Sequence, residues 1–482
     1  MSQHFESHSE DCKNLNEWLC YLETIHKTEI DLGLSRISQV AKRLHIDFSF
    51  ACVITVAGTN GKGTTCAFLE NAFLGETVNG QKQKVAVYSS PHIELFNERL
   101  RINKCDVDDQ SLISAFETIE RARGEISLSY YEYTTLAAFL VLMAVKPDII
   151  ILEVGLGGRL DATNIIDADV AVITTIDIDH QTFLGNDRET IGFEKAGIMR
   201  ANQHIIVGDP DVPQSVLNHA KELNADVDKT IQKEAFSKLK IRNKNFFISK
   251  QSLSANQEEE RWQWQYVELH EDINEAKFSL CNLANTHIPQ DNVATALMVL
   301  KQLGVNLTTT KVNALIKQTQ VAGRTELFKG SYFNGNSLND NSLKSSDVKS
   351  NKLMLQCDVM LDVGHNPHAG RYLAKKLTQF KIQNKFQRII AVVAMLADKD
   401  VANTLSPLSE VIDDWNIASL TEPRAATIEQ MKNVLTHFTN SINCFDNITQ
   451  AFKMANQKAE STDLILVFGS FYTVAEIRQL LV

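Results

Sequence analysis

The sequence predicts an α/β protein with two domains, each built on a mostly parallel sheet. Two observations carry this prediction. Short runs of β-branched and other apolar residues alternate with longer segments of helical periodicity through residues 50–208, which is the pattern of strands joined by crossover helices. The same pattern starts again, over a shorter length, after residue 350. We therefore expect a domain of residues 1–320 and a smaller one of residues 321–482.

The predicted strands of the first domain are rich in Val and Ile and too short to be typical helices, as expected for strands buried on both faces. They are FACVITVAG (50–58), KVAVYSS (84–90), DIIILEV (148–154), DVAVITTI (169–176) and HIIVG (204–208). Helical periodicity fills the intervals between them. The predicted helices are TTCAFLENAFLG (64–75), SLISAFETIERARG (111–124), TTLAAFLVLMAV (134–145) and RETIGFEKAGIM (188–199).

The second domain repeats the plan with fewer elements. Its predicted strands are LMLQCDVMLDVG (353–364), RIIAVVAML (388–396) and LILVFGS (464–470), with a helix PHAGRYLAKKLTQF (367–380) and two more helices in the last interval. The segment 330–351 is rich in Asn and Ser and nearly free of aliphatic residues, so it is predicted to be a mobile surface loop between two strands.

Composition excludes several classes of protein. A net charge of −11 argues against a general affinity for nucleic acid. No apolar run is long enough to span a membrane, and the polar, acidic start of the chain has no signal-peptide pattern. Eight scattered cysteines without a C-x-x-C motif favour buried, reduced thiols over a metal site or disulfides. We expect a cytoplasmic protein.

The stretch VITVAGTNGKGTT (53–65) resembles a phosphate-binding loop, with a difference in spacing from the Walker A motif. Gly61 and Lys62 provide its Gly-Lys pair, but the first glycine is missing and the hydroxyl is delayed to Thr64. A strand, a glycine-rich turn and a helix place backbone N–H groups at one point, which makes an anion site. The residues Thr59 to Thr64 (Thr59, Asn60, Gly61, Lys62, Gly63, Thr64) therefore predict a nucleotide triphosphate site, without separating a kinase from an ATPase or a ligase.

Polar residues follow the other predicted strands, at the edge where α/β sheets form their sites. Ser90 and Glu153 end two strands, and His180 follows a third together with Asp177 and Asp179. A hydroxyl, a carboxylate and an imidazole near a nucleotide are suited to a hard divalent cation, although each residue alone has ordinary structural roles. Lys195 lies on a predicted helix, where it is either solvated or part of the site.

The second domain has one comparable turn. Asp362, His365 and Asn366 lie where a strand ends and a helix begins, and Arg324 lies near the domain boundary. An arginine and a carboxylate from a second domain suit closure over a nucleotide. Asp362 and Asn366 are equally explained as a helix-capping pair.

Taken together and in order, six motifs resemble the folate branch of the Mur ligase superfamily, the bacterial bifunctional dihydrofolate synthase/folylpolyglutamate synthases. The resemblance runs from about residue 15 to the C-terminus, interrupted mainly at 75–83 and 330–351. The motifs are GTNGKGTT, SSPHIELFNERLRI, EVGLGGRLDATNI, DIDHQTFLGNDRETIGFEKAGI, LDVGHNPHAG and VFGSFYTVAEI. The resemblance implies a P-loop ATPase-like domain of the Mur ligase central type and a Rossmann-like C-terminal domain. The family commonly has Ala where this chain has Gly364, and we expect little consequence from that difference.

The resemblance also implies roles for individual residues. The ATP site would comprise Thr59 to Thr64 with Asn292, Arg324 and Asp362, and the Mg²⁺ site Thr64, Ser90, Glu153 and His180. Lys195 matches a lysine that the family carries as a carbamate, so the resemblance places it in the site beside Lys62 and His180 as a catalytic group. The pterin side would involve Thr24, Lys27, Ser129, Tyr131, Asp161 and Ala162.

The implied reaction is ATP-dependent ligation of L-glutamate to dihydropteroate and to tetrahydrofolate through an acyl phosphate, in a monomer. A monofunctional folylpolyglutamate synthase or dihydrofolate synthase is the alternative within the ligases, and a cell-wall Mur ligase fits the downstream motifs less well. Outside the ligases, a P-loop kinase, a regulatory ATPase or a non-catalytic nucleotide-binding module would also explain residues 53–65.

Overall fold

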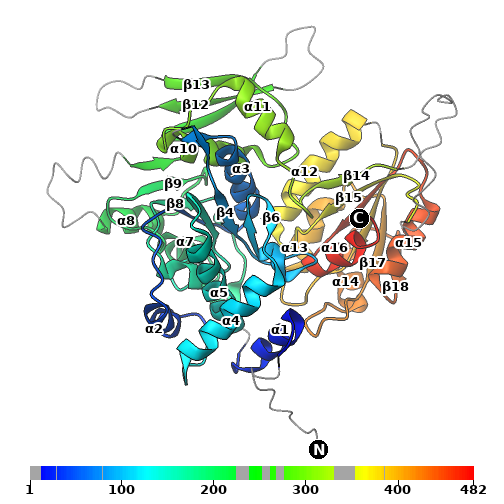
Figure 1. Ribbon diagram of the computed structural model, residues 1–482. Coiled ribbons are helices and arrows are strands. Elements are labelled where there is room, and N and C mark those ends of the chain that lie inside the picture. The colour runs from blue at the N-terminus through cyan, green and yellow to red at the C-terminus, as the bar shows by residue number, and fades with distance from the viewer. Residues whose placement is uncertain are drawn as a thin grey trace, which may run out of the picture. The chain divides into compact units, whose positions relative to one another are not determined.

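The structure, a computed structural model, describes residues 12–28, 30–78, 80–223, 238–251, 261–267, 276–330, 353–384 and 386–482. The chain forms two compact units, Met1–Thr319 and Gln320–Val482, each of which combines helices with a mostly parallel sheet (Figure 1). The predicted α/β class is confirmed. Among the helices of these described ranges, none is long and apolar enough to cross a membrane.

The first unit is built on an eight-stranded sheet whose central strands carry almost only buried apolar residues. The first six strands in spatial order run parallel, the seventh runs antiparallel to them, and the eighth runs antiparallel to the seventh. In order across the sheet they are β10 (Leu239–Ile241), β9 (His204–Val207), β8 (Val170–Ile173), β1 (Cys52–Ala57), β7 (Ile149–Glu153), β4 (Val85–Tyr88), β5 (Leu100–Ile102) and β6 (Cys105–Asp106). The carboxyl ends of β8, β1, β7 and β4 therefore lie next to one another at one edge of the sheet.

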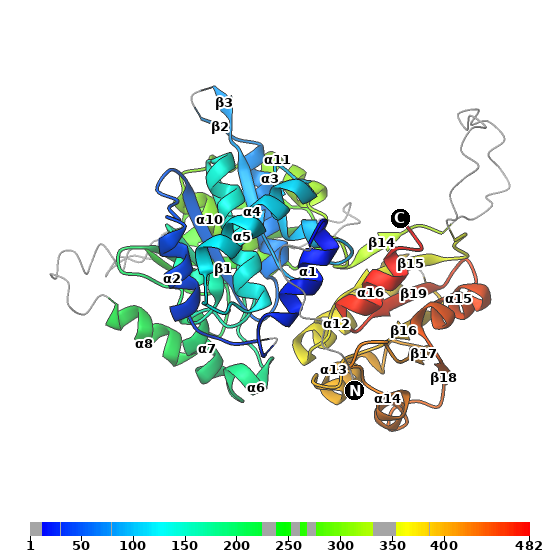
Figure 2. The same cartoon turned by 60° about the horizontal axis from the view of Figure 1, so that its bottom comes forward.

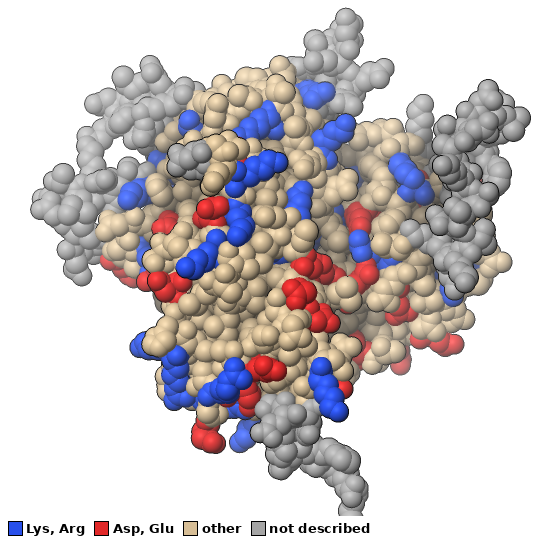
Figure 3. Space-filling model, viewed as in Figure 1, with Lys and Arg blue, Asp and Glu red and all other residues tan. Residues whose placement is uncertain are grey.

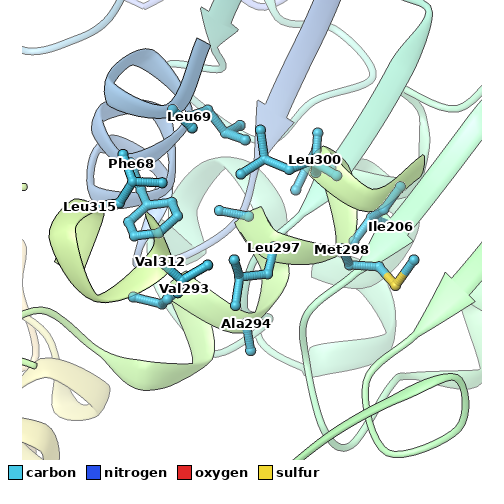
Figure 4. Packing of buried hydrophobic residues seen from close by; sticks show 14 of the residues in the cluster. Phe68, Leu69, Ile206, Val293, Ala294, Leu297, Met298, Leu300, Val312 and Leu315 are labelled. Carbon is cyan, nitrogen blue, oxygen red and sulfur yellow. The ribbon is translucent and has the colours of Figure 1, made fainter. Parts of the chain in front are cut away.

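Helices cover both faces of this sheet. One face carries α1 (Leu15–Thr24), α2 (Ser35–Arg43), α4 (Asp109–Arg123) and α5 (Tyr130–Val145), seen together in Figure 2. The other carries α3 (Lys62–Leu74), α10 (Gln290–Gln302) and α11 (Thr309–Gln318), whose apolar side chains interlock in Figure 4. The helices α7 (Arg188–Ala196) and α8 (Gln214–Glu222) pack on the sheet at β8, β9 and β10. The remaining elements are α6 (Gln181–Leu184), the 3₁₀ turns η2 (Phe96–Arg99) and η3 (Ala162–Ile165), and the hairpin of β2 (Thr77–Val78) and β3 (Gln81–Lys82).

A three-stranded antiparallel sheet completes the first unit. It consists of β11 (Phe246–Gln251), β12 (Arg261–Val267) and β13 (Ala276–Leu283). Along β12 buried and half-buried residues alternate strictly, so Trp262, Trp264 and Tyr266 all enter the core behind α10. This second sheet supports α10, the helix that carries Asn292.

The second unit has a six-stranded sheet, parallel except for its first strand. In spatial order the strands are β14 (Glu326–Phe328), β15 (Asp358–Asp362), β19 (Leu464–Phe468), β16 (Ile389–Val393), β17 (Asp414–Ala418) and β18 (Ile442–Phe445). Its helices are α12 (Pro367–Asn384), α13 (Val401–Leu405), α14 (Ile428–Leu435), α15 (Ile448–Lys458) and α16 (Phe471–Arg478), with the 3₁₀ turn η4 (Ser406–Leu408). The turn after β15 carries Asp362.

Some details differ from the sequence predictions. The helix predicted from Thr64 begins at Lys62, because the turn is complete at Gly61. The eight cysteines, all of them among the described residues, form no disulfide, and Cys66 and Cys357 are buried. The prediction of buried thiols is wrong for the three that lie at exposed positions, Cys20, Cys105 and Cys444. The predicted loop 330–351 lies outside the described residues, apart from Gly330.

Candidate active site

The loop after β1 turns sharply enough to require glycine at two positions. Gly58 and Gly61 have φ angles of 153° and 86°, the second in the left-handed region that glycine adopts without strain. The space around them is also closed. A Cβ on Gly58 would lie 1.8 Å from Thr174 Oγ1, and one on Gly61 would lie 2.3 Å from Asn292 Oδ1. The loop is therefore closely packed, against the end of β8 and against α10.

Hydrogen bonds hold this loop to the segment that follows β8. Thr59 N donates to Thr175 O at 2.7 Å, and its hydroxyl donates to Asp177 O at 2.9 Å. Asn60 N donates to Thr175 Oγ1 at 3.1 Å, while Asn60 O accepts from both Thr174 and Thr175 hydroxyls. Two neighbouring strand ends are thus connected by side chains that the sequence analysis did not single out. Their signal was the Thr-Thr pair directly after an apolar strand.

The first turn of α3 has the features of an anion site. No side chain caps the helix, so its first backbone N–H groups are available to a ligand. Lys62 Nζ donates to Gly58 O at 2.8 Å, which keeps the ammonium group over the loop. Thr64 is buried, and its hydroxyl accepts from Asn292 Nδ2 at 3.1 Å. The structure thus brings Asn292, 228 residues away in sequence, to the loop.

The predicted metal-site residues follow adjacent strands. Ser90 follows β4, Glu153 ends β7 and His180 follows β8, around the loop of β1. The carboxyl ends of parallel strands meet at one edge of a sheet, and neighbouring strands lie about 4.8 Å apart. These residues therefore lie close together at the same edge. The Glu153 carboxylate is 3.6 Å from the position of a Cβ on Gly63, which places it at the first turn of α3. His180 has a φ of 51° and begins α6.

The donor set suits a magnesium ion that nucleotide phosphates help to hold. Within the described ranges, no group of three His, Cys, Asp or Glu residues is arranged to hold a metal by itself. Mg²⁺ is typically bound by one or two carboxylates together with substrate phosphates and water. Glu153, with the hydroxyls of Thr64 and Ser90, provides such an incomplete set of oxygens.

Lys195 is buried in α7, with 3% of its surface exposed, so the solvated alternative is wrong. Burial and, to a lesser extent, the positive charge of Lys62 lower its pKa to about 7, against the opposing effect of Asp179 and Asp161. A lysine in this environment is a neutral amine for much of the time near neutral pH. The neutral amine is the form that adds carbon dioxide to give a carbamate.

The residues predicted for the pterin side divide into two groups. In the first group, Ser129, Asp161 and Ala162 are buried and Tyr131 is half-buried. The Tyr131 ring lies against Gly155, where a Cβ would be 2.7 Å from the phenol oxygen, and stacks on Tyr88. Asp161 accepts hydrogen bonds from Gly155 N, Leu156 N, Thr163 N and the Thr163 hydroxyl. Its carboxylate organises the 155–163 loop.

Thr24 and Lys27, the second group, are exposed at the end of α1. The Thr24 hydroxyl donates to Tyr21 O at 2.7 Å, within its own helix. Farther along the chain, a residue of α2 makes polar contacts with the start of α5. Arg36 forms ion pairs with Asp31 at 2.8 Å and with Glu132 at 3.2 Å, and Glu132 and Ser129 form the capping box of α5. The sequence analysis missed this bridge.

In the second unit, Asp362 is buried at the end of β15. Its carboxylate accepts from Thr325 N and from Gly364 N, both at 2.8 Å. Burial raises its pKa, and the charge of Arg324 partly offsets that effect. Asn366 Oδ1 accepts from Ala369 N at 3.0 Å in the first turn of α12. Asn366 therefore has the capping role, and Arg324, whose guanidinium lies 5.6 Å from the Phe471 ring centroid, is close to Asp362.

Two family models match the chain. Residues 56–281 match the Mur ligase middle domain and residues 349–471 match the glutamate ligase domain of Mur ligases. The chain is 38% identical over 467 residues to the dihydrofolate synthase/folylpolyglutamate synthase of Escherichia coli K12, which covers 97% of this chain and 95% of the relative. It is 39% identical over 466 residues to the Haemophilus influenzae protein of the same name, covering 96% of each chain.

Solved structures that are similar to this chain belong to the same family. That of Escherichia coli FolC in complex with DHPP and ADP has a TM-score of 0.79 at 38% identity, covering 97% of both chains. The Yersinia pestis folylpolyglutamate synthase/dihydrofolate synthase with AMPPNP and a Mn ion has a TM-score of 0.77 at 38% identity, over 97% of this chain and 98% of that one. With both Mur ligase domains and relatives matched along nearly their whole length, this chain belongs to the dihydrofolate synthase/folylpolyglutamate synthase family of Mur ligases.

Proposed function

We propose that this protein joins L-glutamate to dihydropteroate and to tetrahydrofolate, using ATP and Mg²⁺ and passing through an acyl phosphate. The observation that carries the proposal is the first turn of α3, where an uncapped helix N-terminus, Lys62 and the Glu153 carboxylate meet. A relative was solved with Mn, AMPPNP and L-glutamate bound, which supports the same classes of ligand here.

Thr59 to Thr64 would hold the nucleotide phosphates through backbone N–H groups, and Lys62 would turn from the loop carbonyls to the phosphates. Such a cradle supplies positive charge where a transferred phosphoryl group needs it. Asn292 would fix the Thr64 hydroxyl, because Asn292 donates to it from α10. We assign Arg324 and Asp362, in the second unit, to the nucleotide as well.

The ion site would be formed by Thr64, Ser90, Glu153 and His180. Mg²⁺, when bound there, neutralises charge on the phosphates and on the transferred group. Lys195, as its carbamate, would be an anion that orients the ion or its water. Its burial and its lowered pKa favour this modification, because only the neutral amine reacts with carbon dioxide.

The reaction depends more on the positioning of the reacting groups by the protein than on proton transfer to or from its side chains. A carboxylate is a poor electrophile, so the γ-phosphoryl group of ATP is transferred to it first, releasing ADP. The neutral amine of glutamate then attacks the acyl carbon, and inorganic phosphate leaves as the amide forms. Lys62 stabilises the charge of the first transfer, and the buried strand ends exclude water from the acyl phosphate.

The two units would have different roles in the reaction. Residues 1–320 would bind ATP and the pterin, with Ser129, Tyr131, Asp161 and Ala162 on the pterin side, and residues 321–482 would serve as the glutamate-ligase domain. We also expect a cytoplasmic monomer without affinity for nucleic acid or membranes. The net charge of −11 and the mixture of acidic and basic side chains on the face in Figure 3 support this expectation.

The test is product analysis with each acid separately. The protein is incubated with ATP, Mg²⁺ and L-glutamate, and with dihydropteroate in one series and tetrahydrofolate in the other. We expect ADP, phosphate and a new amide in both series, and none when the acid or glutamate is omitted. Activity with one acid would make the enzyme monofunctional. ADP release without an acid, or no turnover with either acid, would overturn the proposal in favour of a simple ATPase or a binding module.

A further inference from the structure

Arg99 is a half-buried arginine for which the described part of the chain provides no carboxylate. It ends η2, next to β5, and its guanidinium carbon lies 5.5 Å from the Phe96 ring centroid and 5.6 Å from that of Tyr130. The centroids of these two rings are 6.3 Å apart, so both rings lie on one side of the guanidinium. Contacts of this kind hold an arginine in place and leave N–H groups that can bind an anion. The proposed function did not use this residue.

Among the described residues, the Arg99 side chain has one hydrogen bond, in which its Nε donates to His92 Nδ1 at 2.9 Å. A ring nitrogen that accepts such a bond carries no proton, so His92 orients the guanidinium without pairing it with an opposite charge. The two terminal nitrogens, which form the bidentate edge for a carboxylate, remain for a ligand.

The neighbouring carboxylate, that of Glu98, already accepts hydrogen bonds from other donors. The Glu98 carboxylate accepts from the backbone N–H groups of Ile93, Glu94 and Leu95 at 2.7 to 2.8 Å. Arg101, two residues after Arg99, has a partner of its own, since it contacts Glu70 at 3.2 Å. The local sequence thus contains one arginine paired within the protein and one that is not.

The location of Arg99 indicates which substrate would supply the anion. Arg99 O accepts from Ser89 N at 2.8 Å, directly beside Ser90. Along the sheet, β7 and β4 lie between β1 and β5, so Arg99 is about 14 Å from the phosphate loop at usual strand spacing. That distance is too long for a direct contact with phosphates held by the loop. It corresponds to the side of the carboxylic acid substrate, one strand beyond Ser90.

We propose that Arg99 binds the α-carboxylate of the terminal glutamyl residue of a folate, and so distinguishes folates from dihydropteroate. This inference rests on the proposed function. In both reactions the carboxyl group that is activated must reach the same phosphoryl group. In a folate that group is the γ-carboxyl, and a short saturated chain connects it to a second carboxylate. Dihydropteroate has no second carboxylate, so it gains nothing from the arginine.

The test compares two substrates in one variant. In Arg99→Gln, kcat/KM for tetrahydrofolate should fall at least about 10-fold, as expected for loss of a charge-assisted hydrogen bond, with most of the change in KM. The value for dihydropteroate should change less than about 2-fold, which also shows that the variant is folded. Arg99→Lys should restore part of the tetrahydrofolate activity. Arg121→Gln, an exposed arginine on α4, is the matched control and should change neither value.

The outcomes separate this inference from the proposed function. If the wild-type protein uses neither acid, the proposed function fails. If the wild type uses both acids and Arg99→Gln lowers both values equally, or lowers neither, the proposed function stands and the assignment of Arg99 is overturned. A loss confined to dihydropteroate would also overturn it, since that substrate lacks the carboxylate in question.

Discussion

The two units contain the same element, a turn from the end of a buried parallel strand into a helix, and use it in opposite ways. After β1 the turn is made of glycines, and no side chain caps α3. After β15 the turn is held by its own side chains, with Asp362 accepting from two backbone N–H groups and Asn366 capping α12. The first turn leaves donors for a ligand, whereas the second satisfies its donors internally.

The comparison teaches that similar turns can offer a nucleotide different groups. After β15 the buried Asp362 carboxylate accepts from two backbone N–H groups and lies near Arg324, so side chains rather than backbone donors would make the contact that we assign to it. The loop after β1 gets its rigidity from elsewhere, from Thr174, Thr175 and Asn292. Support from other elements is what allows a loop to be both rigid and free to bind an anion.

The largest effect should come from removing the charge in the first turn. Lys62→Ala should lower ADP formation at least about 100-fold, because a cation aimed at the transferred group is lost. Thermal unfolding of the variant should remain cooperative and near the wild-type midpoint. Lys42→Ala, on α2 and away from the loop, is the control. A Lys62→Ala protein that keeps most of its turnover would refute the assignment of residues 59–64 to the nucleotide phosphates.

A methyl group in the same turn should have the next largest effect. Gly61→Ala introduces a side chain at a φ of 86° and at 2.3 Å from Asn292 Oδ1. The loop has to shift, so we expect turnover to fall about 10- to 100-fold and stability to fall by about 1–3 kcal/mol. Steady-state kinetics and urea unfolding measure the two effects. An unchanged KM for ATP would contradict the proposed role of the loop.

Two lysines with lowered pKa values, one near each turn, extend the comparison to pH. Near the first turn, Lys195 has its pKa lowered to about 7, mainly by burial, whereas Lys376 beside Asp362 has its pKa lowered to about 8. An unfolded lysine stays protonated to about pH 10.4, so between pH 7 and that value the unfolded state binds the extra proton. Stability contributed by Lys195 therefore rises with pH in this window.

We expect the unfolding free energy of wild type minus that of Lys195→Met to rise by up to about 1.4 kcal/mol per pH unit between pH 7.5 and 9.5 in carbon-dioxide-free buffer. Urea unfolding at several pH values measures it. Added bicarbonate should raise the free energy of unfolding of the wild type, because the carbamate forms only in the folded state. It should not flatten the dependence, because the carbamate binds no proton while the unfolded lysine keeps one. A flat difference under both conditions would mean that Lys195 is not a titrating amine at all.

The smallest effect is expected in the second turn. Gly364→Ala places a Cβ 2.9 Å from Asp362 Oδ1 and 3.0 Å from Ala369 Cβ, at a φ that is not positive. A shift of a few tenths of an ångström accommodates it, so we expect a loss of about 1 kcal/mol and turnover within about 2-fold of wild type. If Gly364→Ala impaired turnover as much as Gly61→Ala, the contrast between the two turns would be wrong.

Local patterns were sufficient to predict the central strands and the loop. Val- and Ile-rich runs indicated β1, β4, β7 and β8, and glycines marked the turn before Lys62. Contacts between distant parts of the chain were not predictable from one sequence. Asn292 reaches Thr64 only because a second sheet supports α10.

Helical periodicity also did not show that Lys195 is buried, since one lysine on a short helix has no distinct pattern. The strand β12 was missed although its alternation of Trp, Gln, Trp, Gln and Tyr is a strong local signal. Thr24 and Lys27 are exposed, and their assignment to the pterin side stays a prediction. Arg36, farther along the chain, is the residue that pairs with Glu132 at the start of α5.

The hydrogen bonds between the loop after β1 and the segment after β8 have a mechanical consequence. Asn60 is joined to Thr174 and Thr175 from both its N–H and its carbonyl, so the two strand ends behave as one rigid piece. A displacement of the loop when phosphates arrive would carry the start of the 174–180 segment with it. His180, at the far end of that segment, would then shift together with Lys62, and the sheet between the two strands would not have to deform.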